Sequence, residues 1–82
     1  MSATRDVVEV LARALTDKPE QVQVQESQHK GTTLIELFVA PGQIGRVIGK
    51  QGRTAAALRT LAATAGEKEG KSVTLEIRDG QP

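Results

Sequence analysis

The chain has 82 residues, a formal net charge of +1 and no cysteine. This length allows one small domain with a modest hydrophobic core, and the lack of cysteine excludes disulfides and thiolate metal sites, as is usual in the reducing cytosol. No apolar run approaches membrane-spanning length, and no basic-then-apolar leader begins the sequence. We therefore expect one domain over residues 1–82, ordered from about residue 5 to residue 79, in the cytoplasm and without a membrane segment.

The first half of the chain predicts a helix and two strands. Residues 2–16 have apolar side chains at helical spacing, which indicates an amphipathic helix. Its apolar face consists of Val7, Val8, Leu11, Ala12 and Leu15. Residues 20–28 alternate valine with glutamine, as a half-exposed edge strand does, and residues 32–40 are apolar enough for the centre of a sheet. A short turn at residues 28–31 predicts that these two strands form an antiparallel hairpin.

The second half predicts two helices and a third strand. Residues 43–48 form a short helix, residues 53–65 a longer one that ends at Gly66, and residues 72–79 a strand buried on one face, followed by a tail at residues 80–82. The core stripe of the longer helix consists of Ala55, Leu58, Leu61, Ala62 and Ala65. The order α-β-β-α-α-β allows a parallel crossover between the second and third strands. We expect a two-layer α+β fold with a mixed three-stranded sheet and its helices on one face.

The segment Ile44-Gly45-Arg46-Val47-Ile48-Gly49-Lys50-Gln51-Gly52-Arg53 joins the two predicted helices. Its glycines let the backbone bend and approach a ligand closely. The helix that follows points unpaired N–H groups and the positive end of its dipole at this turn, which suits a phosphate. Residues 37–66 carry a net charge of +4 with no acidic residue, whereas the rest of the chain carries −3. This polarised charge favours a polyanionic ligand.

The string Val47-Ile48-Gly49-Lys50-Gln51-Gly52, placed before a helix, resembles the signature loop of KH domains. That loop clamps four backbone nucleotides of single-stranded nucleic acid. The chain is also similar to small bacterial single-KH-domain RNA-binding proteins of the KhpA type, and the predicted element order is that of a type II KH-like domain. The resemblance implies an RNA chaperone or post-transcriptional regulator that is not an enzyme and has no cofactor. It also implies a homodimer and a possible heteromer with a larger Jag-type (KhpB) KH protein.

The predicted RNA-binding residues are the loop and its flanks. The backbone clamp is assigned to Gly49, Lys50, Gln51, Gly52 and Arg53, with Arg46 as a further cation. The bases are expected in an apolar groove between the two central helices and the adjoining sheet edge. Candidates for the floor of this groove are Ile44, Val47, Ile48 and Leu58, each of which can instead belong to the core, Leu58 most readily.

Two features of composition limit how this site binds. The chain has no Trp or Tyr, and Phe38 lies in a strand predicted to be buried, so we do not expect an aromatic stacking platform. KH domains usually place a bulky aliphatic residue shortly after the second loop glycine, where this chain has Thr54 and Ala55. We therefore expect a shallow groove, a weakly supported loop, low affinity and little sequence preference.

Three other functions stay open. The chain can be a protein–protein adaptor that keeps the KH shape without binding RNA, or its ligand can be single-stranded DNA. A nucleotide-binding enzyme is disfavoured because a P-loop needs Lys and then Ser or Thr after its second glycine, whereas Arg53 and Thr54 follow here. His29 has no neighbouring carboxylate in the sequence, so we interpret it as a solvated turn residue rather than a catalytic base.

Overall fold

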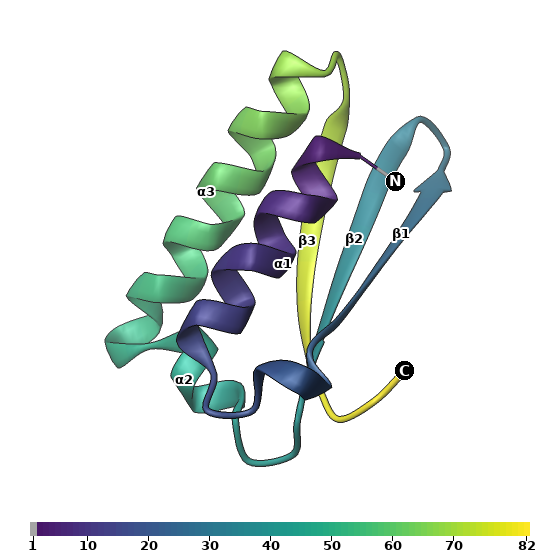
Figure 1. The fold of residues 1–82 in the computed structure, drawn as a ribbon. Helices are drawn as coiled ribbons and strands as arrows, with labels where there is room; N and C mark the ends of the chain where they lie inside the picture. Colours follow the sequence, from purple (N-terminus) through teal and green to yellow (C-terminus); the bar gives the residue numbers. More distant parts are fainter. Residues whose placement is uncertain (1) are drawn as a thin grey trace.

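The computed structural model of the chain describes residues 2–82 as two layers, a three-stranded sheet with its helices on one face (Figure 1). The elements are α1 (Ala3–Leu15), a 3-10 turn (Pro19–Gln21), β1 (Gln23–His29), β2 (Thr32–Val39), α2 (Ile44–Ile48), a second 3-10 turn (Lys50–Gly52), α3 (Arg53–Lys68) and β3 (Ser72–Asp79). The strand order is β1-β2-β3, with β1 antiparallel and β3 parallel to the central β2. The predicted α+β architecture and element order are confirmed.

Helix α1 begins at a side-chain cap and covers the sheet with a narrow face. The Ser2 hydroxyl accepts a hydrogen bond from the Arg5 backbone N–H at 3.0 Å, which satisfies one of the free N–H groups of the first turn. Val8 and Ala12 are buried one turn apart. Val7, which was predicted on the apolar face of this helix, is 41% exposed and does not belong to the core. Each residue turns a helix by about 100°, and this rotation moves Val7 away from the buried line of Val8 and Ala12.

The centre of the core lies between β2 and the helices. Ile35, Leu37 and Val39 alternate along the helix-facing side of β2 and are completely buried. Strand β1 begins at Gln23 rather than at the predicted residue 20, because Pro19 opens a 3-10 turn instead. A proline has no N–H to donate to a sheet ladder, so it favours such a turn before the strand.

Helix α3 is longer than predicted and has a smaller buried face. Gly66 does not end it: the helix continues to Lys68, and a Cβ at Gly66 would lie 2.3 Å from Cγ2 of Val73. The glycine therefore lets α3 lie close against β3. Leu61 is 48% exposed and not part of the core stripe, in contrast to the prediction. The buried face of α3 consists of Ala55, Leu58, Ala62 and Gly66.

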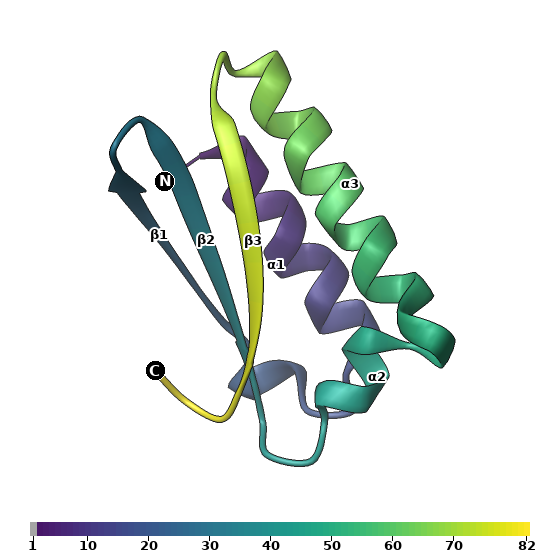
Figure 2. The same ribbon diagram turned by 180° about the vertical axis from the view of Figure 1, so that it is seen from behind.

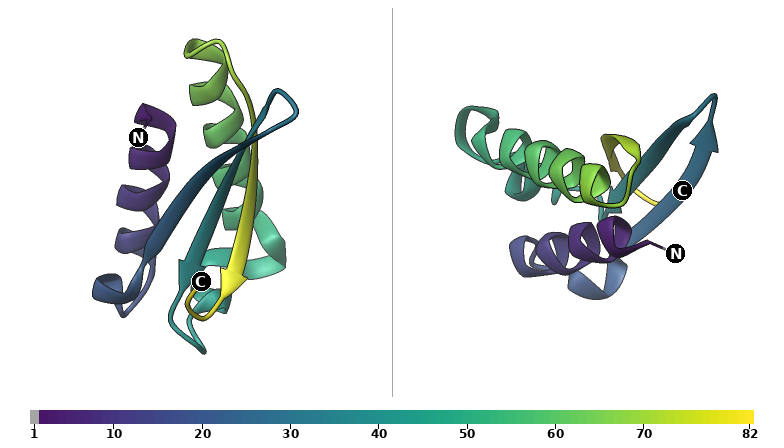
Figure 3. Two further views of the ribbon diagram at one scale, coloured as in Figure 1. Left: turned by 90° about the vertical axis from the view of Figure 1, so that its right-hand side faces the viewer. Right: turned by 90° about the horizontal axis from the view of Figure 1, so that it is seen from above.

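Helix α1 is tied at both ends to the segment that carries the loop. It lies beside α3 and runs in the opposite direction (Figure 3). Near its start, the backbone N–H and the hydroxyl of Thr4 both donate to the Glu69 carboxylate just beyond α3, and these hydrogen bonds, the hydroxyl's first, lower the pKa of Glu69. Near its end, Oε1 of Gln43 accepts hydrogen bonds from the Thr16 hydroxyl at 2.9 Å and the Asp17 N–H at 2.8 Å. These contacts fix α2 and α3 relative to α1.

The length and composition of a helix decide whether it can span a membrane. Within residues 2–82, none of the helices combines the length and the apolar character that crossing a bilayer requires.

Candidate nucleic-acid interface

The loop between α2 and α3 has an unusual backbone. Gly49 ends α2 with φ 76° and ψ 174°, a region that is essentially restricted to glycine. Gln51 and Gly52 then adopt left-handed angles, with φ of 57° and 71°. The Gly52 N–H donates to the Gly49 carbonyl at 3.2 Å, which closes the turn. The predicted Gly-x-x-Gly turn is therefore a tight structure in which Gly49, Gln51 and Gly52 all have positive φ angles, which residues other than glycine rarely adopt.

Thr54 supports the loop from beneath. It lies so close to Gly49 that a Cβ on the glycine would be 2.2 Å from the Thr54 hydroxyl oxygen. Ala55, the next residue, is buried in the core. The expectation of a weakly supported loop assumed that a small residue leaves a gap here, whereas Thr54 is in direct contact with the loop. Its contact requires that residue 49 has no side chain.

The exposed basic side chains of the loop indicate a binding site for an anion. Lys50, Gln51 and Arg53 are exposed, and Arg53 donates to the Gln51 side-chain carbonyl at 2.9 Å. Within residues 2–82, neither Lys50 nor Arg53 forms an ion pair, whereas Arg46 lies 2.9 Å from the Asp17 carboxylate in an exposed pair. The first turn of α3 has no acidic residue and no side-chain cap. The positive end of its dipole is therefore not neutralised by the chain itself.

The predicted apolar floor is only partly at the surface. Ile44 and Ile48 are half-buried and adjoin the loop. Val47 is completely buried and Leu58 is 3% exposed, so both belong to the core. A side chain with no exposed surface cannot contact a bound base, and Val47 is therefore removed from the candidate contacts. Phe38 is buried, as predicted, so it does not offer a stacking surface in this conformation.

Arg59 was not assigned to the site from the sequence. It is exposed on α3, and none of the residues from 2 to 82 forms an ion pair or side-chain hydrogen bond with it. The signal that identifies it is its position within the acid-free segment 37–66, six residues after Arg53 on the same helix.

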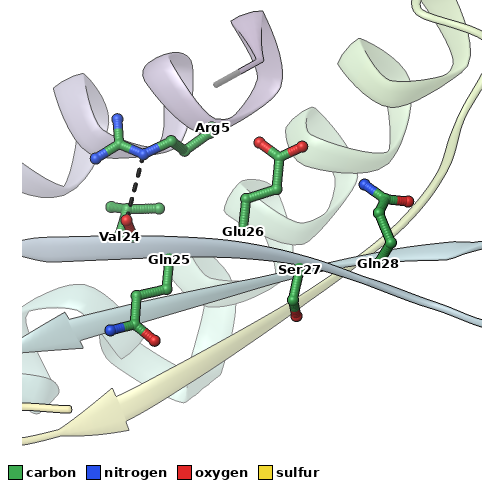
Figure 4. Close-up of a pocket in the computed structure, with 6 residues that line it drawn as sticks. All are labelled: Arg5, Val24, Gln25, Glu26, Ser27 and Gln28. Carbon is green, nitrogen blue, oxygen red and sulfur yellow. Dashed lines mark hydrogen bonds between the residues drawn. The ribbon is translucent and has the colours of Figure 1, made fainter.

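The hollow between α1 and β1 does not form a second binding site. It is lined by Arg5 and by residues 24–28 (Figure 4). Arg5 donates to the Val24 carbonyl at 3.2 Å and pairs with Glu9, while Glu26 accepts from Ser2 at 2.7 Å. Because these polar groups already have partners, and because strand side chains alternate between the two faces (Figure 4), the lining does not converge on a ligand.

The other sequence candidates do not form a reactive cluster. No group of three or more His, Cys, Asp or Glu side chains in the described part of the chain, residues 2–82, is placed to hold a metal ion. His29 is exposed at the end of β1. The loop and the first turns of α3 are thus the best candidate site.

Comparison with known proteins identifies the family. The family described as KhpA/KhpB, KH domain, matches residues 5–77, which include the loop and both helices beside it. This chain belongs to the KhpA/KhpB KH-domain family. The two-layer fold with the order α-β-β-α-α-β is accordingly a type II KH-like fold, as the sequence resemblance predicted.

Curated relatives within this KH family are similar over almost their whole length. The RNA-binding protein KhpA of Aquifex aeolicus (strain VF5) is 51% identical over 77 residues, which cover 94% of this chain and 98% of the relative. The RNA-binding protein KhpA of Clostridium perfringens (strain 13 / Type A) is 47% identical, with 89% and 97% covered. That of Chlamydia trachomatis serovar D is 40% identical, with 92% and 96% covered. All three relatives are named for RNA binding.

Proposed function

We propose that this protein binds single-stranded RNA through the loop at residues 49–52 and the first turn of α3. The observation that carries the proposal is the glycine-dependent loop, which leads into an uncapped helix within an acid-free segment of net charge +4. The names of the relatives and the family match support RNA as the polymer. The names of the relatives describe RNA binding and do not support an enzymatic function.

Binding of this kind relies on the phosphate backbone. Lys50 and Arg53 supply mobile positive charge, and the free N–H groups at the start of α3 point back toward the loop. Such contacts position a strand without reading its sequence. If about four phosphates are neutralised, a plot of the logarithm of the affinity against the logarithm of the salt concentration should have a slope of about −3. Ile44 and Ile48 offer a shallow apolar surface for the bases, so we expect low affinity and little sequence preference, as suits an RNA chaperone or post-transcriptional regulator.

The helix layer offers a surface for self-association. Within residues 2–82, the large hydrophobic side chains that remain exposed are Val7, Val10 and Leu61, on the adjacent helices α1 and α3. A homodimer through this face would leave both loops free. Two linked sites raise the effective concentration of RNA at the second site and so compensate for the low affinity of each. The same face can accept the KH domain of a larger KhpB-type protein.

The test is a loop variant with a charge-matched control. Lys50→Asp with Gln51→Asp should abolish binding of mixed-sequence single-stranded RNA in fluorescence anisotropy, because it places two carboxylates where phosphates bind. Both residues are exposed, and aspartate tolerates the left-handed angles at position 51, so unfolding free energy should change by at most about 0.5 kcal/mol. The control, His29→Asp with Lys30→Asp, changes formal charge equally at an exposed turn and should bind nearly as the wild type does.

The outcomes separate the candidate functions. If the loop variant retains wild-type affinity and salt dependence, the loop is not the contact site. If the wild-type protein binds neither RNA nor single-stranded DNA, the protein is an adaptor with a KH shape. Stronger competition by DNA than by RNA of the same sequence would assign DNA as the ligand.

A further inference from the structure

One cation beside the loop already has an acidic partner within the chain. The acid-free segment, residues 37–66, carries four basic residues: Arg46, Lys50, Arg53 and Arg59. The guanidinium of Arg46 lies 2.9 Å from a carboxylate oxygen of Asp17, whereas the other three form no ion pair within residues 2–82. The charge of Arg46 is therefore balanced before any ligand binds.

The backbone of the chain holds Asp17 next to Arg46. Asp17 lies just beyond the end of α1, and its N–H donates to Oε1 of Gln43 at 2.8 Å. The same oxygen accepts a hydrogen bond from the Thr16 hydroxyl at 2.9 Å. Gln43 directly precedes α2, and Figure 2 shows this end of α1 next to α2. Because Arg46 follows Gln43 by three residues, the contact that fixes the backbone of Asp17 also keeps its carboxylate near Arg46.

The charged neighbours of Asp17 do not cancel its charge. Lys18 and Glu20 are exposed, have opposite charges and form no ion pair within residues 2–82. Arg13, in the last turn of α1, pairs with Glu9 at 2.8 Å instead. With two acidic residues and one basic residue, residues 16–22 have a net charge of −1. Asp17 thus brings a negative charge from another part of the chain to the basic segment.

Arg46 is close enough to the loop to contact a strand that the loop holds. It precedes Gly49 by three residues, which corresponds to about 4.5 Å along the axis of α2. Its side chain is 61% exposed, so it can leave Asp17 without disturbing the core. An exposed ion pair is weak, and a guanidinium binds phosphate as well as carboxylate, with two parallel hydrogen bonds. A phosphate of the RNA backbone can therefore replace the carboxylate.

We propose that Asp17 is an internal counter-ion that competes with the RNA backbone for Arg46. In the free protein its carboxylate takes the place of a phosphate. When RNA binds, Arg46 turns to the RNA, and Asp17 is left without its partner beside a polyanion. The contact therefore limits the affinity of the loop. This inference rests on the proposed function.

The test compares two aspartates in similar ion pairs at opposite ends of α1. Asp17 is 57% exposed, and Asp6 is 60% exposed and lies 3.1 Å from Arg5. Asp6 precedes Leu15, the end of α1, by nine residues, which corresponds to about 14 Å along the helix axis. This exceeds the distance of about 10 Å over which 0.1 M salt screens exposed charges. Asp17→Asn and Asp6→Asn therefore change the formal charge equally but at different distances from Arg46.

Fluorescence anisotropy with a mixed-sequence octanucleotide of single-stranded RNA measures the difference. At about 0.1 M salt, Asp17→Asn should tighten binding about two- to fivefold and steepen the salt dependence by about 0.7, because Arg46 then neutralises a phosphate without an opposing charge. Asp6→Asn should stay within about 1.5-fold of the wild type. Asparagine at position 17 keeps the N–H that binds Gln43, and circular dichroism establishes that each variant is folded.

Removal of the arginine shows whether Asp17 acts through it. Arg46→Gln alone should weaken binding about two- to fivefold. In the Arg46→Gln protein, Asp17→Asn should have no larger effect than Asp6→Asn, because the two substitutions at the ion pair are coupled. If Asp17→Asn tightens binding as much in the Arg46→Gln protein as in the wild type, Asp17 repels RNA through space and the inference is wrong.

Further outcomes separate failure of this inference from failure of the proposed function. Loss of binding in the Lys50→Asp, Gln51→Asp variant, together with equal effects of Asp17→Asn and Asp6→Asn, would overturn the counter-ion but keep the loop. A wild-type protein that binds no RNA would overturn both. In an NMR titration of the wild type with RNA, the carboxyl carbon of Asp17 and the side-chain Nε–H of Arg46 should shift while the carboxyl carbon of Asp6 does not. Unchanged signals of Asp17 and Arg46 refute the exchange of partners.

Discussion

Replacing Gly49 by alanine tests whether the backbone of this chain fixes the geometry of its loop. The angles of Gly49, φ 76° and ψ 174°, cost another residue about 1–3 kcal/mol. The added Cβ would also lie 2.2 Å from the Thr54 hydroxyl oxygen and 2.6 Å from the Thr54 Cβ, so the backbone must shift. We expect a loss of more than about 3 kcal/mol in unfolding free energy, out of about 4–12 kcal/mol for a chain of this size.

Two other glycines serve as controls for Gly49→Ala. Gly52 has φ 71° and open space around its Cβ position, so Gly52→Ala should cost only the left-handed strain of about 1–2 kcal/mol. Gly45 lies inside α2 with no close neighbour, and Gly45→Ala should stabilise the protein by about 0.5–1 kcal/mol. Thr54→Ala should not rescue Gly49→Ala, because the Cβ at residue 54 remains.

Urea denaturation followed by far-ultraviolet circular dichroism is the suitable assay for this series, since the chain has no Trp or Tyr. The reasoning is refuted if Gly49→Ala unfolds within about 0.5 kcal/mol of Gly52→Ala, because the contact with Thr54 would then have no energetic consequence.

Three further predictions follow from single contacts. Asp17→Asn should tighten RNA binding about two- to fivefold at low salt, because an exposed ion pair of about 0–1 kcal/mol no longer competes for Arg46; unchanged anisotropy would exclude Arg46 from the interface. The hydrogen bonds from Thr4 lower the pKa of Glu69, so the ionised carboxylate stabilises the fold above the usual glutamate pKa, and this stability is lost as pH falls through the lowered value. Glu69→Gln should therefore melt below the wild type at neutral pH, with a gap that closes in acid; parallel melting curves contradict this. Leu61→Glu should convert a dimer to a folded monomer in sedimentation equilibrium, and an unchanged dimer would rule out this face.

Most of the fold could be predicted from the sequence because local patterns carry it. The alternation of Val73, Leu75 and Ile77 predicts β3 with the bounds found in the structure, Ser72–Asp79. The same holds for the start of α3 at Arg53, which follows from a glycine turn before a run of helix formers. The candidate loop was predictable for a similar reason, because two closely spaced glycines such as Gly49 and Gly52 indicate a turn with positive φ angles.

The errors concern contacts between segments far apart in the chain. Periodicity gives the apolar stripe of a helix but not which edge of the stripe the sheet covers. Val7, on the predicted apolar face, and Leu61, in the predicted core stripe, are therefore both exposed. Gly66 was predicted to end α3 because glycine often does so. Its actual contact is Val73 on β3, which no local pattern reveals. The sequence could not decide whether Val47 lines the groove or belongs to the core, because this depends on how α2 packs.

The small size of the buried side chains of α3 connects these errors to the site. Its core contacts are mainly alanines and one glycine, with Leu58 as the single large side chain. Burial of an alanine contributes far less than that of a leucine, since the free energy follows the apolar area removed from water. The position of α3, and of the loop before it, therefore depends strongly on the polar contacts at both ends of α1, through Glu69 and Gln43. Helix α1 thus helps to hold the loop in the geometry that the structure shows.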